Sequence, residues 1–446
     1  MKRILWFRRD LRVEDNTLLS LGGDVLPIFI FDTNILLKLE RDDKRTALIF
    51  LHVKLLKEKL KAIGLDLKIF YGTPQDVFAY LLKLYDFKEV AASGDYDEYA
   101  KNRDREISHL LHFHYLYDTY IFKPKEVLKS DGTPYLVFTP FYKQALKLLV
   151  NKDISKKQIA KHTLLASDYD LLTSLNAQEV QSKEISLENI GFKNFDITMQ
   201  DSSEKLKSFK NRLLEYENGR DYLDLNATSQ LGFELRFGVV GIRMLLREMM
   251  QMNGSEAFIR QLIFRDFYAY LLFHFPSLAW QNYKYSFNGI QNSEYYECFC
   301  NAATGVPIVD AAVRELLVSG NMHNRARMIA ASFFTKDLLL PWQWGDRFFA
   351  QHLLDYDAAS NTLSWQWSAG TGIDPQPYFR IFNPYLQSKK FDKEGKYIKK
   401  WLPQLQDIDA KYLHDEEYLL HVNIPNYPKP MVNHKVASKK AIELFN

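Results

Sequence analysis

Residues 355–384 read DYDAASNTLSWQWSAGTGIDPQPYFRIFNP, and the composition of this stretch is that of a site wall rather than of ordinary core. Two carboxylates, Asp355 and Asp357, precede a lone amide at Asn361, and large indoles follow at Trp365 and Trp367. Polar groups of fixed geometry beside large aromatic rings suit a planar heteroaromatic ligand that forms hydrogen bonds, with aromatic surface left for a second planar ligand. The stretch therefore predicts a binding site.

The whole chain has the composition of a soluble protein with an excess of aromatic residues. Its 446 residues exceed one ordinary core, so we expect two domains. Aromatic residues make up 14% of the chain, and the formal net charge of +3 permits nucleic acid as a partner only through a local basic patch. The only cysteines, Cys298 and Cys300, fit a reducing cytoplasm and cannot supply the four thiolates of an iron–sulfur cluster.

The N-terminus begins MKRILWFRRDLR, with charges where a signal peptide needs an apolar run. No window reaches about 18 uninterrupted apolar residues, the length that a membrane-spanning helix needs. We therefore expect a cytoplasmic protein with no membrane partner.

The first part of the chain alternates short apolar runs with helical patterns. The runs of strand length are 3–8, 25–32, 67–71 and 88–92, and the helical patterns between them are 46–63 and 75–85. This alternation predicts an α/β domain over 1–128, with a parallel, Rossmann-like sheet. Neither GxGxxG nor GxxxxGK[ST] follows the first strand, so neither a dinucleotide nor a P-loop phosphate site is indicated there.

The rest of the chain is predicted to be a connector followed by a helical domain. Residues 129–205 are assigned to the connector, because their composition turns polar and aperiodic from about 150. Long helical patterns then occupy 234–252, 256–274, 308–319, 323–340 and 346–355, so 206–446 should form a mostly α-helical domain.

Three further segments of this second part combine polar and aromatic residues. One segment places hydroxyls and backbone N–H groups just ahead of a predicted helix, at Thr228, Ser229, Leu231 and Gly232. Such groups could hold an anion, or they could merely cap the helix. One helical face of 258–272 suits DNA or plain packing and carries Gln261, Phe264, Arg265 and Tyr268. In 321–331, Asn324, Arg327 and Met328 share a face, and an arginine there could pair with a later carboxylate.

Four motifs, taken in order and spacing, resemble one family, the DNA photolyases and cryptochromes. They are TSQLGFELRFG (228–238), TGVPIVDAAVREL (304–316), MHNRARMIAASFFTKDLLLPWQWG (322–345) and the opening stretch. The resemblance runs from residue 1 to about 405. The Asn324–Arg325 pair resembles the residues at this position in class I enzymes, which act on cyclobutane pyrimidine dimers, and differs from those of the (6-4) photolyases.

The resemblance implies FAD as the cofactor, held by the helical domain. Residues matching the surroundings of the FAD phosphates and ribityl chain are Tyr216, Thr228, Ser229, Leu231 and Gly232. By the same resemblance, Arg327 pairs with Asp355, Asp357 lies along the flavin, and Asn361 faces flavin N5. Trp365 and Trp342 match the two inner members of the family's electron-supplying tryptophan chain. A second, light-harvesting chromophore in the N-terminal domain is allowed but not identified, and no metal is implied.

The resemblance also implies damaged DNA as the partner of a monomeric protein. Residues that match positions touching the flipped dimer or its flanking phosphates are Asn324, Gln261, Phe264, Arg265, Arg325, Met328, Trp367 and Arg380. The implied activity is light-driven repair of cyclobutane pyrimidine dimers by electron transfer from reduced FAD.

Four positions depart from the family pattern. Gln261 replaces a glutamate that bonds the dimer, and Phe264 replaces the tryptophan that clamps it. Gly289 replaces the tryptophan that is the outermost member of the electron chain in the family, and Asn321 replaces the tryptophan that usually precedes the MHNR motif. These departures favour the alternative of a cryptochrome-like blue-light receptor that binds FAD with weak or no repair.

Two further questions follow from these departures. Residues that could complete the electron route instead are Tyr283, Tyr285 and Trp344. Tyr99-Ala100 stands where some relatives bind folate through an Asn-Glu pair, which argues against a folate antenna.

Overall fold

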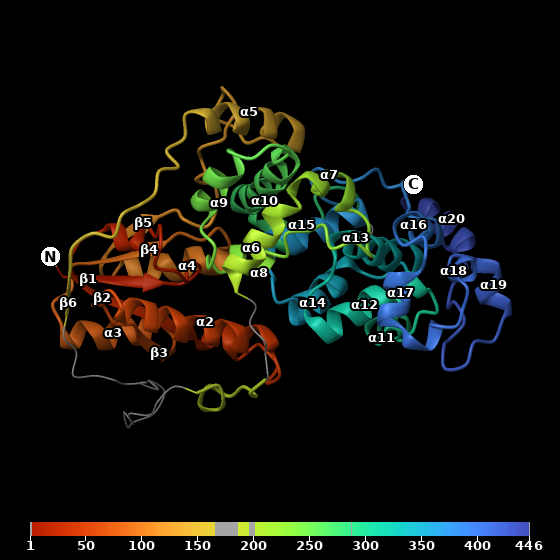
Figure 1. The fold of residues 1–446 in the computed structure, drawn as a ribbon, viewed down its shortest axis with the longest axis horizontal. Helices are drawn as coiled ribbons and strands as arrows, with labels where there is room; N and C mark the ends of the chain where they lie inside the picture. The colour runs from red at the N-terminus through yellow and green to blue at the C-terminus, as the bar shows by residue number, and fades with distance from the viewer. Residues whose placement is uncertain (1, 166–185, 196–200, 287, 446) are drawn as a thin grey trace. The chain divides into compact units, whose positions relative to one another are not determined.

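The computed structural model describes residues 2–165, 186–195, 201–286 and 288–445, which pack as two compact units (Figure 1). Unit 1 comprises Met1–Tyr135, Thr139–Ser208 and Ser229–His274. Unit 2 comprises Leu136–Phe138, Phe209–Thr228 and Phe275–Asn446. Residues 229–274, which the sequence patterns group with the helical domain, thus pack with unit 1.

Unit 1 contains the parallel sheet that the sequence predicts. Its strands are β1 (Lys2–Phe7), β2 (Gly23–Asp32), β3 (Lys68–Gly72), β4 (Glu89–Ser93), β5 (His112–Leu116) and β6 (His162–Leu164). The order is β3-β2-β1-β4-β5, every pairing is parallel, and β6 pairs with the first residues of β2. The Rossmann-like prediction is therefore confirmed. The sequence patterns missed β5 and β6, because neither is a long apolar run.

Both faces of this sheet are covered, which explains the unbroken apolar runs of its strands. In β1, Leu5 and Phe7 pack with α2, whereas Ile4 and Trp6 point to the other face and pack with α3. The helices of unit 1 are α1 (Thr33–Leu36), α2 (Lys44–Lys61), α3 (Pro74–Leu84), α4 (Glu98–Ser108), α5 (Phe138–Val150), α6 (Ser202–Asn211), α8 (Gly232–Arg236), α9 (Ile242–Met249) and α10 (Glu256–His274).

The single helix predicted over 234–252 is wrong, because the chain breaks between α8 and α9. Gly238 lies there with φ +63°, in the left-handed region that favours glycine. A Cβ on Gly238 would lie 2.2 Å from the carbonyl oxygen of Arg9, so the backbone of the two segments meets closely. The close approach, which periodicity does not report, ends α8.

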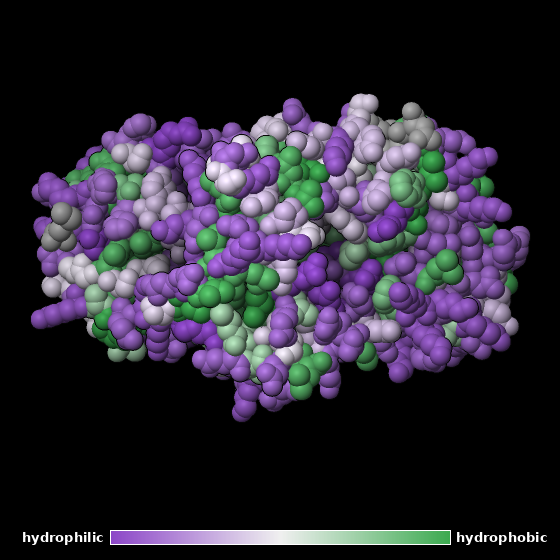
Figure 2. All heavy atoms as spheres, turned by 90° about the horizontal axis from the view of Figure 1, so that it is seen from above, coloured by the Kyte–Doolittle hydropathy of each residue, from purple (hydrophilic) through white to green (hydrophobic). Residues whose placement is uncertain are grey.

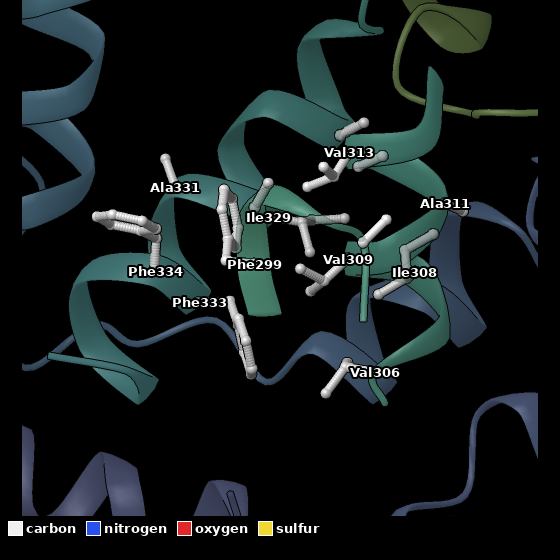
Figure 3. Close-up of a cluster of buried hydrophobic side chains, with 14 of the residues drawn as sticks. Phe299, Val306, Ile308, Val309, Ala311, Val313, Ile329, Ala331, Phe333 and Phe334 are labelled. Atoms are coloured by element: carbon white, nitrogen blue, oxygen red, sulfur yellow. The ribbon is translucent and has the colours of Figure 1, made fainter. Parts of the chain in front are cut away.

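Unit 2 is helical, and its described residues include no β-strand. Its helices are α7 (Tyr216–Gly219), α11 (Ser293–Cys300), α12 (Pro307–Ser319), α13 (Asn324–Ser332), α14 (Trp342–His352), α15 (Ala358–Ala369), α16 (Pro384–Phe391), α17 (Lys396–Trp401), α18 (Ala410–Leu413), α19 (Glu416–His421) and α20 (His434–Phe445). Figure 3 shows part of their common core, in which Phe299, Phe333 and Phe334 lie with aliphatic side chains of α12 and α13.

Local signals set the ends of the helices that carry the site. The Asp357 carboxylate caps α15 by accepting a hydrogen bond from the Ser360 N–H, and Gly370 ends the helix with φ +83°. Helix α13 continues into a π-helical turn, Phe333–Asp337, where the predicted helix 323–340 loses its α-helical geometry. Such turns often accompany functional sites.

No described helix combines the length and apolar character needed to cross a membrane. The face drawn in Figure 2 is mostly hydrophilic, with hydrophobic side chains in separate patches.

Candidate cofactor and nucleic-acid site

Asn361 is held by the half-buried carboxylate of Asp346 on the neighbouring helix α14. Its Nδ2 donates to the backbone carbonyl of Asp346 at 3.0 Å and to Asp346 Oδ1 at 2.7 Å. The Thr362 hydroxyl donates to the same Oδ1 at 3.0 Å. Burial raises the pKa of Asp346 to about 6, although the bonds from Thr362 and Asn361 oppose this rise. With both amide hydrogens used, Asn361 presents only its Oδ1 to a ligand.

An ion pair stands at the approach to α15. Arg327 Nη2 lies 3.1 and 3.0 Å from the two carboxylate oxygens of Asp355, so the pair expected from the resemblance is present. The Nε of Arg327 donates to the Met322 carbonyl, which fixes the guanidinium plane. Asp357, two residues beyond Asp355, is buried and caps α15. The three charges are therefore positioned before any ligand arrives.

Trp365 lies against the backbone of α14, where glycine makes room for it. A Cβ on Gly345 would lie 2.2 Å from Cη2 of the Trp365 indole, so any larger residue would displace the ring. Trp365 is 1% exposed, and its Nε1 has no hydrogen-bond partner. Trp342, at the start of α14, is also buried, but its Nε1 donates to Asn282 Oδ1 at 2.7 Å.

The residues expected to face DNA differ in how accessible they are. Trp367 and Met328 are half-buried, whereas Asn324 and Arg380 are exposed. Asn324 Nδ2 lies 3.7 Å from the Met328 sulfur on the same helix. Arg325, by contrast, pairs with Asp221 at 3.0 Å and stacks on Phe391 at 4.3 Å, so its guanidinium is already engaged inside unit 2.

The candidate residues on α10 belong to unit 1, so they are described there by themselves. Gln261 and Phe264 are half-buried, and the Phe264 ring contacts Tyr268 edge-on at 4.9 Å. Arg265 donates to the carbonyls of Thr119 at 2.7 Å and Leu235 at 3.1 Å, and its guanidinium stacks 4.3 Å from the Tyr120 ring centroid. These contacts hold Arg265 within unit 1 as a packing residue.

The expected phosphate-binding residues are divided between the units. Tyr216 is buried in unit 2 and Thr228 is half-buried there. In unit 1, the Ser229 hydroxyl accepts from the Leu231 N–H at 3.4 Å, and Gly232 begins the five-residue helix α8. Ser229 therefore serves locally as a turn residue, whereas the structural alternative left open from the sequence was a helix cap, and α8 has no side-chain cap.

The polar groups around Asn361 in unit 2 fit a flavin. Asn361 offers one neutral acceptor, and two buried or paired carboxylates stand just ahead of it. A protonated ring nitrogen of a heteroaromatic ligand is the natural partner of such an acceptor. Among the described residues, no group of three or more His, Cys, Asp or Glu side chains is placed to hold a metal ion.

Two polar residues near this site were missed by the sequence reasoning. Asp346 holds Asn361 but precedes it by fifteen positions, and only its place beside Trp342 and Trp344 hinted at a role. Lys336, in the π-helical turn, is fully buried and donates to the Ala369 carbonyl at the end of α15. Burial lowers the pKa of Lys336 to about 7.

Comparisons with known proteins identify the family of this chain. The family model described as DNA photolyase matches residues 3–159, and the one described as FAD binding domain of DNA photolyase matches 258–446. A deoxyribodipyrimidine photo-lyase from Alkalihalophilus pseudofirmus is 33% identical over 99% of this chain and 97% of that protein.

Solved structures give the same result. A bacterial class III photolyase from Agrobacterium tumefaciens has a TM-score of 0.85 and 29% identity, covering 100% of this chain and 97% of that one. An archaeal photolyase from Sulfolobus tokodaii, solved with two FAD molecules, has a TM-score of 0.83 and 28% identity, covering 100% and 99%. With full-length relatives above 30% identity and a matching FAD-binding domain, the chain belongs to the DNA photolyase family.

Proposed function

We propose that this protein is a photolyase that repairs cyclobutane pyrimidine dimers in DNA, using light absorbed by reduced FAD. The observation that carries the proposal is Asn361, whose two amide hydrogens are bonded to Asp346 and whose Oδ1 remains as an acceptor. Trp365, four residues further along α15, has a buried indole N–H without a hydrogen-bond partner. An acceptor that cannot turn into a donor favours a protonated ring nitrogen and hence the reduced cofactor.

Bound FAD would supply the chemistry, as a light-driven donor and acceptor of single electrons. The chain supplies position and environment. Asn361, Asp357 and the Arg327–Asp355 pair would hold the flavin ring and its polar chain, with Tyr216 and Thr228 toward the phosphates. Because the indole of Trp365 is buried against α14, it would keep water away from the side of the flavin that it faces.

DNA would meet the other side of α15. Photolyases are among the enzymes that take their target bases out of the stack, which costs unstacking energy. Stacking on Trp367 and phosphate contacts to the exposed Arg380 would offset that cost, because base–aromatic stacking is worth about 1–3 kcal/mol per base. Asn324 and Met328 are proposed to line the dimer pocket. Arg325 would position Asp221 and Phe391 rather than touch DNA.

The finer assignments are part of the same proposal. By function, we propose residues 1–128 as the antenna domain, 129–205 as the connector and 206–446 as the FAD-binding domain. We also propose a monomer of the class I type. A cytoplasmic location is proposed as well, supported by the free thiols of Cys298 and Cys300. The Sulfolobus structure's second FAD, described as a novel light-harvesting cofactor, supports an antenna chromophore in this chain. Its identity can be read from the absorbance of the chromophores released on denaturation.

The test of repair is recovery of thymine absorbance in an oligonucleotide that contains a cyclobutane dimer. Reduced holoprotein under blue or near-ultraviolet light should restore it, and an unilluminated sample should not. Trp367→Ala should abolish dimer binding, whereas Trp280→Ala, at an exposed tryptophan of the same unit, should leave it intact. Illuminated protein that restores no more absorbance than boiled protein would refute the proposal.

A second candidate function, a blue-light receptor with weak or no repair, is favoured by Gln261 and Phe264. Gln261 lacks the negative charge that could stabilise a developing proton, and Phe264 has a smaller stacking face than tryptophan. Under this alternative, Gln261→Glu combined with Phe264→Trp should raise dimer affinity and turnover from near zero. Efficient repair by the unaltered chain would rule the alternative out.

A further inference from the structure

A continuous series of ring contacts runs from Trp365 to Trp344 through the core of unit 2. The Trp365 and Phe334 centroids are 5.3 Å apart, those of Phe334 and Tyr296 are 6.2 Å apart, and those of Tyr296 and Trp344 are 5.3 Å apart. Every contact in the series is edge-to-face, and Figure 3 shows Phe334 in this core. We call these four residues the Trp344 branch.

A second connection joins the same two tryptophans through the backbone. The indole of Trp365 lies against Gly345, where an added Cβ would be only 2.2 Å from Cη2. Gly345 directly follows Trp344 in the chain. Electron tunnelling is fastest through closely packed or bonded atoms, so both connections couple Trp344 to Trp365.

The outer end of the route implied by the resemblance offers no aromatic ring. Gly289 stands there with φ +82°, and a Cβ on it would lie 2.5 Å from the Pro341 nitrogen. Among the described residues, Trp342 makes no aromatic ring contact, and its indole N–H is bonded to the Asn282 amide oxygen. Because an amide oxygen is a very weak base, it cannot take a proton from an oxidised indole.

Trp365 differs from Trp344 and Tyr296 in whether it can lose a proton after oxidation. Trp365 is buried with an unpartnered indole N–H, so an oxidised Trp365 has no group to receive its proton and must regain an electron. Trp344 and Tyr296 are half-buried at the edge of the cluster. Burial and the neighbouring Cys300 raise the pKa of Tyr296 to about 12, so this phenol keeps its proton until it is oxidised.

We propose that Trp344 is the outer electron donor of this chain, supplying Trp365 through Phe334 and Tyr296 when the flavin is reduced by light. The inference rests on the proposed function, because it requires bound FAD. Phenylalanine is too hard to oxidise to hold the charge, so Phe334 acts only as packed material between Trp365 and Tyr296.

The electrons and protons balance with an external thiol as the final reductant. For each electron that leaves Trp365 toward the cofactor, Trp344 gives one electron to Trp365 and releases its indole proton to water. A thiol then returns one electron and one proton to Trp344, and two thiyl radicals combine as a disulfide.

The experiment compares single variants of the holoprotein under blue light with dithiothreitol as the thiol. Flavin bleaching gives the rate of photoreduction, and flash-induced absorbance in the visible region detects the tryptophan radical. Trp344→Phe should slow photoreduction by roughly tenfold and abolish the long-lived tryptophan radical, and Tyr296→Phe should slow it less because the ring stays in place. Trp280→Phe, an exposed tryptophan outside the branch, is the matched control and should behave as wild type.

The outcomes separate the inference from the proposed function. Wild-type rates and radical signals in Trp344→Phe, at equal FAD content and far-ultraviolet circular dichroism, would overturn the inference and leave the proposed function standing. The same holds if only Trp280→Phe or Trp342→Phe is slowed. If Trp344→Phe fails to fold, slower photoreduction in Tyr296→Phe than in wild type supports the branch, and wild-type rates in that variant overturn it. Wild-type protein that binds no FAD would remove both proposals.

Discussion

Two buried polar clusters, one in each unit, use similar groups in opposite ways. In unit 1, the carboxylates of Asp15 and Asp118 meet Arg12, Arg243 and Arg247, and every carboxylate oxygen has at least one donor. We call these five residues the Asp118 cluster. In unit 2, Asn361 and Thr362 both donate to Asp346, and Trp365 follows on the same helix as Asn361; we call these four residues the Asn361 cluster.

The difference between the clusters lies in what remains unused. The Asn361 cluster leaves the Asn361 Oδ1 open and the Trp365 Nε1 without a partner. A closed set of ion pairs stabilises or specifies a fold, whereas an open atom held rigidly in place can serve a ligand. We infer that the Asp118 cluster is structural and that the Asn361 cluster is the site.

The largest expected effect comes from opening the closed cluster. Asp118→Asn leaves the buried guanidinium groups of Arg12 and Arg243 short of their shared negative partner. Breaking a buried pair in this way costs about 3–5 kcal/mol, which urea unfolding of the variant should show. The control is Asp86→Asn, which removes an exposed pair with Lys88 and should cost at most about 1 kcal/mol. Equal losses in both variants would contradict the structural role of the Asp118 cluster.

Features that depend on neighbouring residues could be predicted from the sequence, whereas features that depend on distant residues could not. The strands around β1 were predictable because side chains that alternate between two covered faces leave an unbroken apolar run. A ligand role for 355–384 could be predicted because its polar and aromatic residues are adjacent in the chain, and that role stays a prediction. The ion pairs of Asp118 could not be predicted, because its partners Arg12 and Arg243 lie 106 and 125 positions away in the chain.

The same reasoning explains the errors within the helical part. Hydrophobic periodicity continues across Gly238, whereas the structure breaks there because two backbone segments come into contact. Asp346 escaped notice because a carboxylate on a helix surface and one turned toward Asn361 have the same sequence pattern. Tertiary contacts set both features, and local patterns do not encode them.

The buried amine of Lys336 in unit 2 gives the next effect. Because burial lowers the pKa of Lys336 to about 7 from an unfolded value of 10.5, the folded protein favours the neutral amine. Its contribution to stability is complete above pH 10.5 and is lost as the pH falls toward 7. Lys336→Met has similar volume and no titration, so its stability relative to wild type should rise as the pH falls from about 10 to 7. Thermal unfolding at several pH values measures this, and a constant difference would contradict the assignment.

Asp346→Asn tests the Asn361 cluster itself, with a smaller effect of the opposite sign. Burial raises the pKa of Asp346 to about 6 from 3.8, so its contribution to stability is present below pH 3.8 and is lost as the pH rises through 6. The stability of Asp346→Asn relative to wild type should therefore rise between about pH 4 and 6. An asparagine at 346 can donate as well as accept, so Asn361 is no longer held as an acceptor only.

That freedom should appear in the flavin as well as in unfolding. In Asp346→Asn, Asn361 can turn a donor toward the cofactor, which would favour the unprotonated ring nitrogen and make the flavin harder to keep reduced. The reduced flavin should then reoxidise faster in air than in wild type, while Asp407→Asn, an exposed carboxylate elsewhere in unit 2, should match wild type in both measurements. If reoxidation were unchanged although the pH dependence disappeared, Asp346 would stabilise the fold only. The orientation of the Asn361 Oδ1 toward the flavin would then not depend on Asp346. The two clusters would differ only in their contributions to stability.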